Sequence, residues 1–105
     1  MFHTPSNKIP VMVTLALPAD WPQALAEAIP AQRQLVNRLL AEGAIQSYSV
    51  SADRRKVWLV LVVEDTPFAV DELMRDFPII EFADYDWQPL LFTNDSSSVM
   101  HYSLN

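Results

Sequence analysis

A run of seven apolar residues at positions 57–63 most strongly limits how this chain can fold. Side chains alternate between the two faces of a β-strand, and here both alternating sets are apolar. The first set is Val57, Leu59, Leu61 and Val63, and the second is Trp58, Val60 and Val62. Such a strand is expected at the centre of a sheet that is covered on both faces.

The segments around this strand predict an α+β fold. Stretches rich in β-forming residues predict strands over residues 9–17, 45–51, 56–63 and 80–88. The spacing of apolar residues and the prolines predict a short helical piece at 22–29, a helix from Pro30 to a stop at Gly43, and a helix at 67–77 capped by Thr66. The order βαββαβ is typical of the ferredoxin-like fold, a four-stranded antiparallel sheet with two helices on one face.

The chain has 105 residues, the size of one ordinary domain. We place this domain at residues 9–92, between an N-terminal extension (1–8) and a C-terminal tail (93–105). The tail is mostly polar, and its apolar exceptions are Val99, Met100, Tyr102 and Leu104. Because a fully solvated segment gains nothing from apolar residues, we expect the tail to pack on a partner subunit.

Two helices can cover only one face of a four-stranded sheet, so the second face needs another cover. Residues 11–17 repeat the pattern of 57–63, with mostly apolar side chains on both faces. A bare apolar face of this size favours association. We therefore expect a second copy to pack its sheet against this one, giving a homodimer or a multiple of dimers. The alternative is that the C-terminal tail covers the face within one chain.

Composition argues against several classes of partner. Thirteen acidic residues against seven Lys and Arg give a formal charge of −6, so nucleic acid is not expected. The absence of cysteine excludes disulfides and thiolate zinc sites, and no histidine spacing indicates a metal, so no metal or cofactor is expected. No apolar run approaches the roughly 20 residues that span a bilayer, and the N-terminus lacks the apolar run of a signal peptide. A membrane is therefore not expected as a partner, and a cytoplasmic location is the default.

Two carboxylates on the predicted strand at 80–88 are the candidate catalytic residues. Asp84 and Asp86 are two residues apart and therefore share a face, with Tyr85 and Trp87 on the other. Paired carboxylates can act as acid and base when burial or a neighbouring charge shifts the pKa of one of them. The alternative is an edge strand whose charges prevent aggregation.

Tyr48, Trp58 and His101 are the candidate residues of a ligand pocket. An aromatic side chain with a polar end can line an apolar cavity and fix a ligand by a hydrogen bond. His101 can shuttle protons if the oligomer brings it into a cleft. The alternatives are that Tyr48 and Trp58 are ordinary core residues, and that His101, like His3, lies near a chain end without a function.

Three segments resemble the muconolactone isomerase family. Residues 13–18 are similar to its first strand and Leu-Pro corner, residues 41–43 to the turn that ends its first helix, and residues 77–90 to its Leu-Pro-Leu…Asp-x-Glu…Pro-Leu segment. The resemblance covers most of residues 11–90. It implies a dimeric α+β barrel, in which two ferredoxin-like sheets pack face to face. It also implies a site in the cleft between helices, sheet and partner.

The chain departs from that family where the family carries basic residues and histidine. Ala16 precedes the Leu-Pro corner, and Gln46, Ser47 and Val50 stand in the family's Arg-His-x-Trp-Arg stretch. Holding an anion and moving its proton require such groups. The remaining arginines of the first helix, Arg33 and Arg38, follow a register that predicts a solvated face.

Two functions therefore stay open. The first is a cofactor-free isomerase that binds a small organic ligand in an intersubunit cleft. The second is a binding or assembly module that keeps the barrel without the chemistry.

Overall fold

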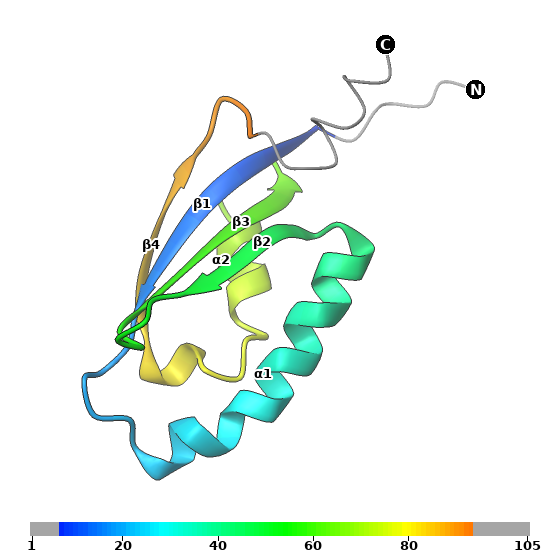
Figure 1. Cartoon of the computed structure of the whole chain (residues 1–105). Coiled ribbons are helices and arrows are strands. Elements are labelled where there is room, and N and C mark those ends of the chain that lie inside the picture. The colour runs from blue at the N-terminus through cyan, green and yellow to red at the C-terminus, as the bar shows by residue number, and fades with distance from the viewer. Residues whose placement is uncertain (1–6, 94–105) are drawn as a thin grey trace.

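The computed structural model describes residues 7–93 (Figure 1). Its elements are β1 (Lys8–Ala16), α1 (Gln23–Glu42), β2 (Ile45–Val50), β3 (Lys56–Glu64), α2 (Ala69–Met74), a 3-10 turn η1 (Ile80–Phe82) and β4 (Asp84–Pro89). The sheet order is β2-β3-β1-β4, and every neighbouring pair is antiparallel. The predicted α+β, ferredoxin-like fold is therefore confirmed.

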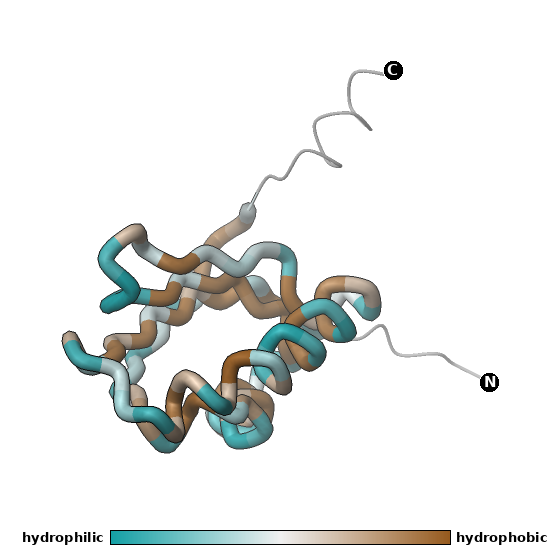
Figure 2. The backbone as a smooth tube through the Cα atoms, turned by 60° about the horizontal axis from the view of Figure 1, so that its bottom comes forward, coloured by the Kyte–Doolittle hydropathy of each residue, from teal (hydrophilic) through white to brown (hydrophobic). Residues whose placement is uncertain are grey.

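The core lies between the sheet and the two helices, which form a second layer on one of its faces (Figure 2). β1 and β3 pair along their whole length at the centre of the sheet. The completely buried side chains of these two strands are Val13, Leu15, Leu59 and Leu61. Burial of apolar surface contributes about 25 cal/mol per Å², so this layer holds the helices against the sheet.

The first helix is continuous, and the expected division at Pro30 is wrong. α1 runs for 20 residues and begins after Pro22, with Pro30 inside it. Its buried residues, Leu25, Gln32, Val36 and Leu39, lie on both sides of Pro30. Because they form one stripe against the sheet, their burial outweighs the hydrogen bond that the proline nitrogen cannot donate. The stop at Gly43 is confirmed by its left-handed φ of 80°.

The second half of the chain also differs from the sequence expectation in two places. α2 is limited to Ala69–Met74, and Phe68 precedes it without a side-chain cap, so Thr66 is not the cap. The predicted strand at 80–88 is shorter, because η1 occupies its first residues. The amide groups of Ile80 and Phe82 donate to carbonyls three residues earlier. This turn lets Phe77 and Ile79 stay buried in the core before β4 begins.

Within residues 7–93, both helices lie on the same side of the sheet (Figure 1). On the other face Trp58 is 41% exposed, and it pairs with Thr14 of β1 and Ser49 of β2. Val60 is buried, whereas Met12 and Val62 are half-buried. We call this surface the open face. The open face is less apolar at its β2 edge than at its centre. That a second copy covers this face stays a prediction.

Candidate functional site

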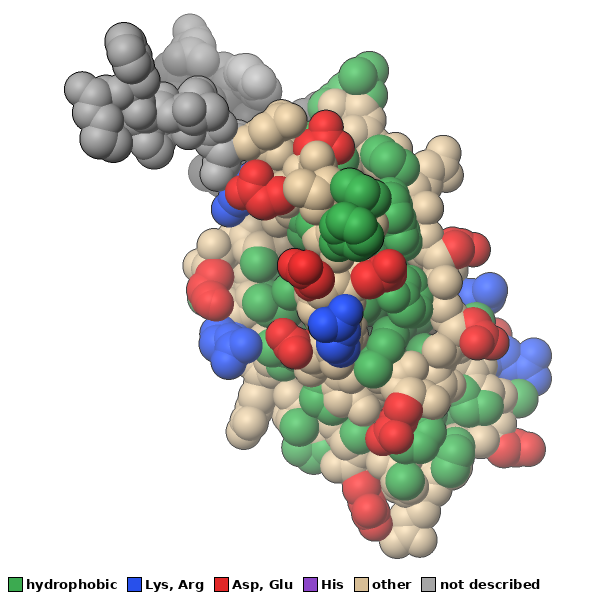
Figure 3. Space-filling model, turned by 180° about the vertical axis from the view of Figure 1, so that it is seen from behind, with side chains coloured by type: hydrophobic (Ala, Val, Ile, Leu, Met, Phe, Trp, Pro, Cys, Tyr) green, Lys and Arg blue, Asp and Glu red, His purple; other side chains and the backbone are tan. Residues whose placement is uncertain are grey.

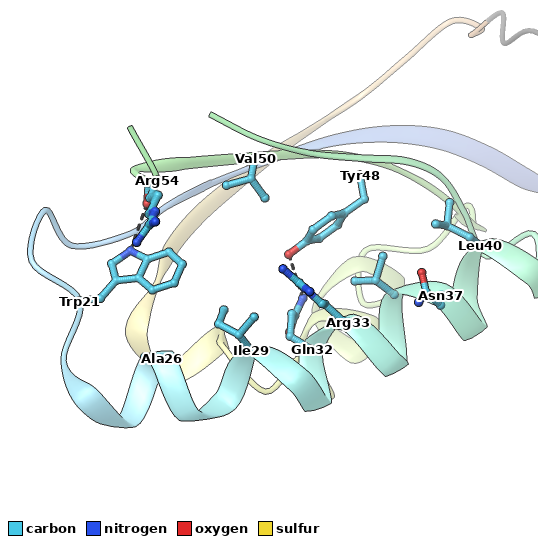
Figure 4. Close-up of a pocket in the computed structure, with 11 residues that line it drawn as sticks. Trp21, Ala26, Ile29, Gln32, Arg33, Asn37, Leu40, Tyr48, Val50 and Arg54 are labelled. Atoms are coloured by element: carbon cyan, nitrogen blue, oxygen red, sulfur yellow. Dashed lines mark hydrogen bonds between the residues drawn. The ribbon is translucent and has the colours of Figure 1, made fainter. Parts of the chain in front are cut away.

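A pocket of about 760 Å³ lies between α1 and the edge strand β2, on the helix side of the sheet (Figure 4). Its lining residues are Trp21, Ala26, Ile29, Gln32, Arg33, Val36, Asn37, Leu40, Tyr48, Val50 and Arg54. Trp21 and Arg54 lie at one end, and Leu40 and Asn37 lie at the other. The volume is in the range of pockets that hold small organic ligands.

The register of β2 places its two pocket side chains. Tyr48 pairs with Leu59 and Val50 pairs with Val57, and both partners are buried under the helices. Tyr48 and Val50 therefore point toward α1, as Figure 4 shows. Since β2 is the edge strand of the described sheet, the pocket is open to solvent beside it.

Tyr48 is held by Gln32 of α1. The Nε2 of Gln32 donates to the Tyr48 hydroxyl at 3.2 Å, and the Oε1 of Gln32 accepts from the backbone N–H of Ile79 at 3.4 Å. Burial raises the pKa of the Tyr48 phenol above its ordinary value of 10.0, and the hydrogen bond from Gln32 opposes this increase. Tyr48 is therefore an uncharged hydrogen-bond donor at neutral pH.

The opposite end of the pocket is built by the loop before α1 and the turn between β2 and β3. The indole Nε1 of Trp21 donates to the carbonyl of Arg54 at 3.2 Å, and the Arg54 guanidinium lies 5.7 Å from the ring centre. Arg54 has a φ of 64°, which is uncommon for a residue other than glycine. The indole therefore holds both the backbone and the cation of Arg54 at the pocket.

The turn itself is stabilised by the carboxylate of Asp53. This carboxylate accepts hydrogen bonds from the Ser51 hydroxyl at 2.6 Å and from the Arg55 N–H at 3.0 Å. The Ser51 bond first, and then the Arg55 bond, lower the pKa of Asp53. The turn that carries Arg54 is thus closed by its own side chains.

The charge of the pocket differs from that of the whole molecule. The chain carries a formal charge of −6, and acidic side chains prevail over basic ones on the face shown in Figure 3. The pocket lining includes two arginines, Arg33 and Arg54, and no described acidic or histidine side chain. A bound anion would therefore meet two cations and one neutral donor.

The two candidate carboxylates lie elsewhere. Asp84 and Asp86 pair with Ala16 and Thr14, which places both on the open face, in a shallow hollow with Lys56. Tyr85 points to the helix side, where its hydroxyl donates to Asp71, and this bond raises the pKa of Tyr85 to about 12. The expected sharing of a face by the carboxylates is confirmed, and the sheet separates them from the pocket.

Only one of the three candidate pocket residues lines this pocket. Tyr48 does, whereas Trp58 projects from the open face on the opposite side of the sheet. His101 and the other residues of 94–105 lie outside the described residues. Between residues 7 and 93 there is no cluster of three side chains suited to hold a metal, and no helix has the length and apolarity to cross a bilayer.

Of the lining residues, only Tyr48 was predicted from the sequence, and those that were missed include Trp21, Gln32, Arg33 and Arg54. Arg33 is exposed, as its register predicts, and its side chain also lines the pocket. One signal was present for Gln32, which lies four and seven residues before the buried Val36 and Leu39. A polar residue on a buried helix stripe needs hydrogen-bond partners, and here Tyr48 is one of them.

The described residues define a ferredoxin-like α+β domain with an open pocket between its first helix and its edge strand. Among solved structures, a crystal structure of muconolactone isomerase matches it with a TM-score of 0.62 and 21% sequence identity. The match covers 84% of this chain and 94% of that chain. The resemblance noted in the sequence is thereby confirmed at the level of the fold. No protein-family model matches the chain, and no curated protein matches it significantly.

Proposed function

We propose that this protein binds a small organic anion in the pocket between α1 and β2. The observation that carries the proposal is the pairing of two cations, Arg33 and Arg54, with the neutral donor Tyr48 around one apolar cavity. Guanidinium groups bind carboxylates with short, charge-assisted hydrogen bonds. A carboxylate bound among these residues meets no described acidic side chain in the lining.

The apolar part of the pocket suits a compact hydrocarbon or aromatic body. Ile29 of α1 faces Val50 of β2 across the cavity, and Trp21 lies at one end (Figure 4). Val36 of α1 also lines the pocket. Leu40 and Val50 are 39% and 49% exposed in the described chain, so apolar area remains for a ligand to cover. Such mixed lining, with few polar groups that fix orientation, is typical of small-molecule sites.

Binding is better supported than proton transfer. Removal of a proton next to a carbonyl needs a base within hydrogen-bond reach. Among the described lining residues, the only candidate for such a base is the phenol of Tyr48. Its raised pKa keeps it protonated at neutral pH, so it cannot accept a proton there. An isomerase activity like the one named for the structural neighbour would need a base from outside this pocket lining.

An assay with muconolactone distinguishes these alternatives. We expect no turnover above background. Turnover that disappears in Asp84→Asn or Asp86→Asn, but persists in Asp76→Asn on another surface, would place the base on the open face and favour an isomerase.

Assembly is a second part of the proposal. The open face carries the exposed Trp58 and the half-buried Met12 and Val62, and a second copy packed there would cover them. The non-catalytic alternative, a module that serves only for assembly, needs the open face but not the pocket. Loss of ligand binding with unchanged assembly in pocket variants separates the two.

The direct test compares benzoate with benzamide, which has the same ring and no charge. We expect benzoate to bind more tightly and to shift amide signals of α1 and β2 in NMR titrations. Arg33→Gln or Arg54→Gln should weaken benzoate binding by about tenfold or more, since a hydrogen bond to a charged group contributes about 1.5–3 kcal/mol. The affinity for benzamide should change little.

Arg38→Gln is the matched control for this test. Arg38 lies on the same helix, outside the pocket, and forms an exposed pair with Glu42 at 3.8 Å. Such a pair contributes little to stability. Equal binding of benzoate and benzamide, or an equal loss in Arg38→Gln, would contradict the proposed anion site.

A further inference from the structure

Gln32 is the only polar side chain that is buried among the described residues, with 2% of its surface exposed. It lies on the stripe of α1 that packs against the sheet, where an apolar residue would be ordinary. Both ends of its amide form hydrogen bonds. One bond is to the loop that follows α2, and the other is to Tyr48 in the pocket. Burying an amide without partners is costly, so these two bonds decide how the side chain lies.

The direction of the Gln32 amide follows from its inner partner. The backbone N–H of Ile79 can only donate, so the group that faces it must be the acceptor Oε1. The reversed amide would bring two donors together. The NH₂ end is therefore turned to Tyr48, where it donates to the hydroxyl oxygen at 3.2 Å.

This arrangement determines where the proton of Tyr48 points. The hydroxyl oxygen accepts from Gln32, so the Tyr48 proton cannot be given to that amide. Between residues 7 and 93 no other group accepts it. Since the phenol stays protonated at neutral pH, its O–H is left as a donor for a molecule in the pocket.

We propose that Gln32 is a positioning residue that makes the pocket select ligands with a hydrogen-bond acceptor, such as a carbonyl oxygen, beside Tyr48. The inference rests on the proposed ligand pocket, and it names which polar group of the ligand faces β2. An apolar or donor group at that place leaves the phenol proton of the half-buried Tyr48 without an acceptor on the ligand. A carbonyl or carboxylate oxygen accepts it.

The test uses two uncharged probes of nearly the same shape, acetophenone and α-methylstyrene, which differ by a carbonyl oxygen in place of a methylene. The measured quantity is the ratio of their affinities from NMR titration, compared between variants so that the difference in hydration cancels. Tyr48→Phe should lower the preference for acetophenone by roughly three- to tenfold, the effect of one neutral hydrogen bond.

Gln32→Glu tests the positioning role. A carboxylate at position 32 accepts from both Ile79 and Tyr48, so the Tyr48 proton turns away from the pocket. We expect the acetophenone preference to fall as far as in Tyr48→Phe. When the introduced carboxyl is protonated at lower pH, it can again donate to Tyr48, and the preference should return. The pocket's other charged groups are Arg33 and Arg54. Wild type should show no such pH dependence between pH 5 and 8.

Gln34→Glu is the matched control, because it makes the same amide-to-acid change on α1 at an exposed residue that does not line the pocket. It should leave the probe ratio unchanged. An unchanged ratio in Gln32→Glu, or an equal fall in Gln34→Glu, would overturn the inference. If Gln32→Glu does not fold, Tyr48→Phe decides, because an unchanged ratio there means that the phenol does not donate into the pocket.

The inference and the proposed function fail in different ways. Equal binding of benzoate and benzamide removes the anion preference and leaves the probe ratio intact. Binding of both uncharged probes with a ratio that no variant changes removes the role of Gln32 alone. No binding of any probe at this pocket would overturn both.

Discussion

Gln32 and Arg33 are neighbours on α1, yet they contribute to the pocket through different physical effects. Gln32 is buried and holds Tyr48 through its amide, whereas Arg33 is exposed and brings a charge to the rim. The periodicity of the helix contains the information that Gln32 falls on the buried stripe. It contains nothing about which strand residue lies opposite, so the Gln32–Tyr48 contact required the tertiary structure.

At the residue scale, the raised pKa of Tyr48 predicts how stability depends on pH. Burial favours the neutral phenol, so the folded state binds this proton more tightly than the unfolded state. The resulting stability is fully present below the unfolded pKa near 10 and is lost as pH rises through the higher folded value. We expect the free energy of unfolding to fall more steeply above pH 10 in wild type than in Tyr48→Phe, as measured by urea denaturation.

Tyr85→Phe is the comparison for this prediction. Tyr85 also has a raised pKa, mainly because its hydroxyl donates to Asp71, and it is mostly solvated. Its contribution should appear at higher pH, toward about 12. Identical alkaline slopes for wild type and Tyr48→Phe would show that the Tyr48 phenol is not buried in the folded state.

At the element scale, α1 contains a proline whose replacement should stabilise the protein. Pro30 lies in the interior of the helix and is exposed, and its nitrogen cannot donate to the carbonyl four residues earlier. Pro30→Ala should raise the free energy of unfolding by about 1–2 kcal/mol. This is the helix penalty of proline, about 3 kcal/mol, less about 1 kcal/mol for the greater freedom of the unfolded chain.

Pro22→Ala is the control for the helix prediction, because Pro22 lies at the N-cap and replaces no intrahelical donor. Pro22→Ala should not raise the free energy of unfolding in the same denaturation experiment. A loss of stability in Pro30→Ala would mean that the shape α1 takes at Pro30 is needed for packing on the sheet.

At the scale of the whole molecule, the uncovered face of the sheet predicts self-association. Trp58 is 41% exposed there, and a second copy would bury it. We expect wild type to be a dimer or a multiple of dimers by light scattering, and Trp58→Asp to be a folded monomer, because a carboxylate is costly to bury at an interface. A compact wild-type monomer at micromolar concentration would contradict the prediction.

Trp87→Asp supplies the matched control for assembly. Trp87 is 37% exposed but lies on β4 with its side chain on the helix side of the sheet, away from the open face. It should keep the oligomeric state of wild type. Deletion of residues 94–105 then distinguishes the two possible covers: if the tail covers the face within one chain, its removal should increase association.

The order of elements, the stop at Gly43 and the central position of β1 and β3 were determined by sequence alone. Each depends on local chemistry: alternation or helical spacing of apolar residues, and a glycine that accepts positive φ. The continuity of α1 through Pro30 and the turn η1 before β4 were decided by tertiary packing, because burial of a shared core outweighs the local preference. The pocket was also decided by tertiary packing. Arg33 is distant in sequence from Tyr48 and Arg54, and only the packing of α1 beside β2 brings the three side chains around one cavity.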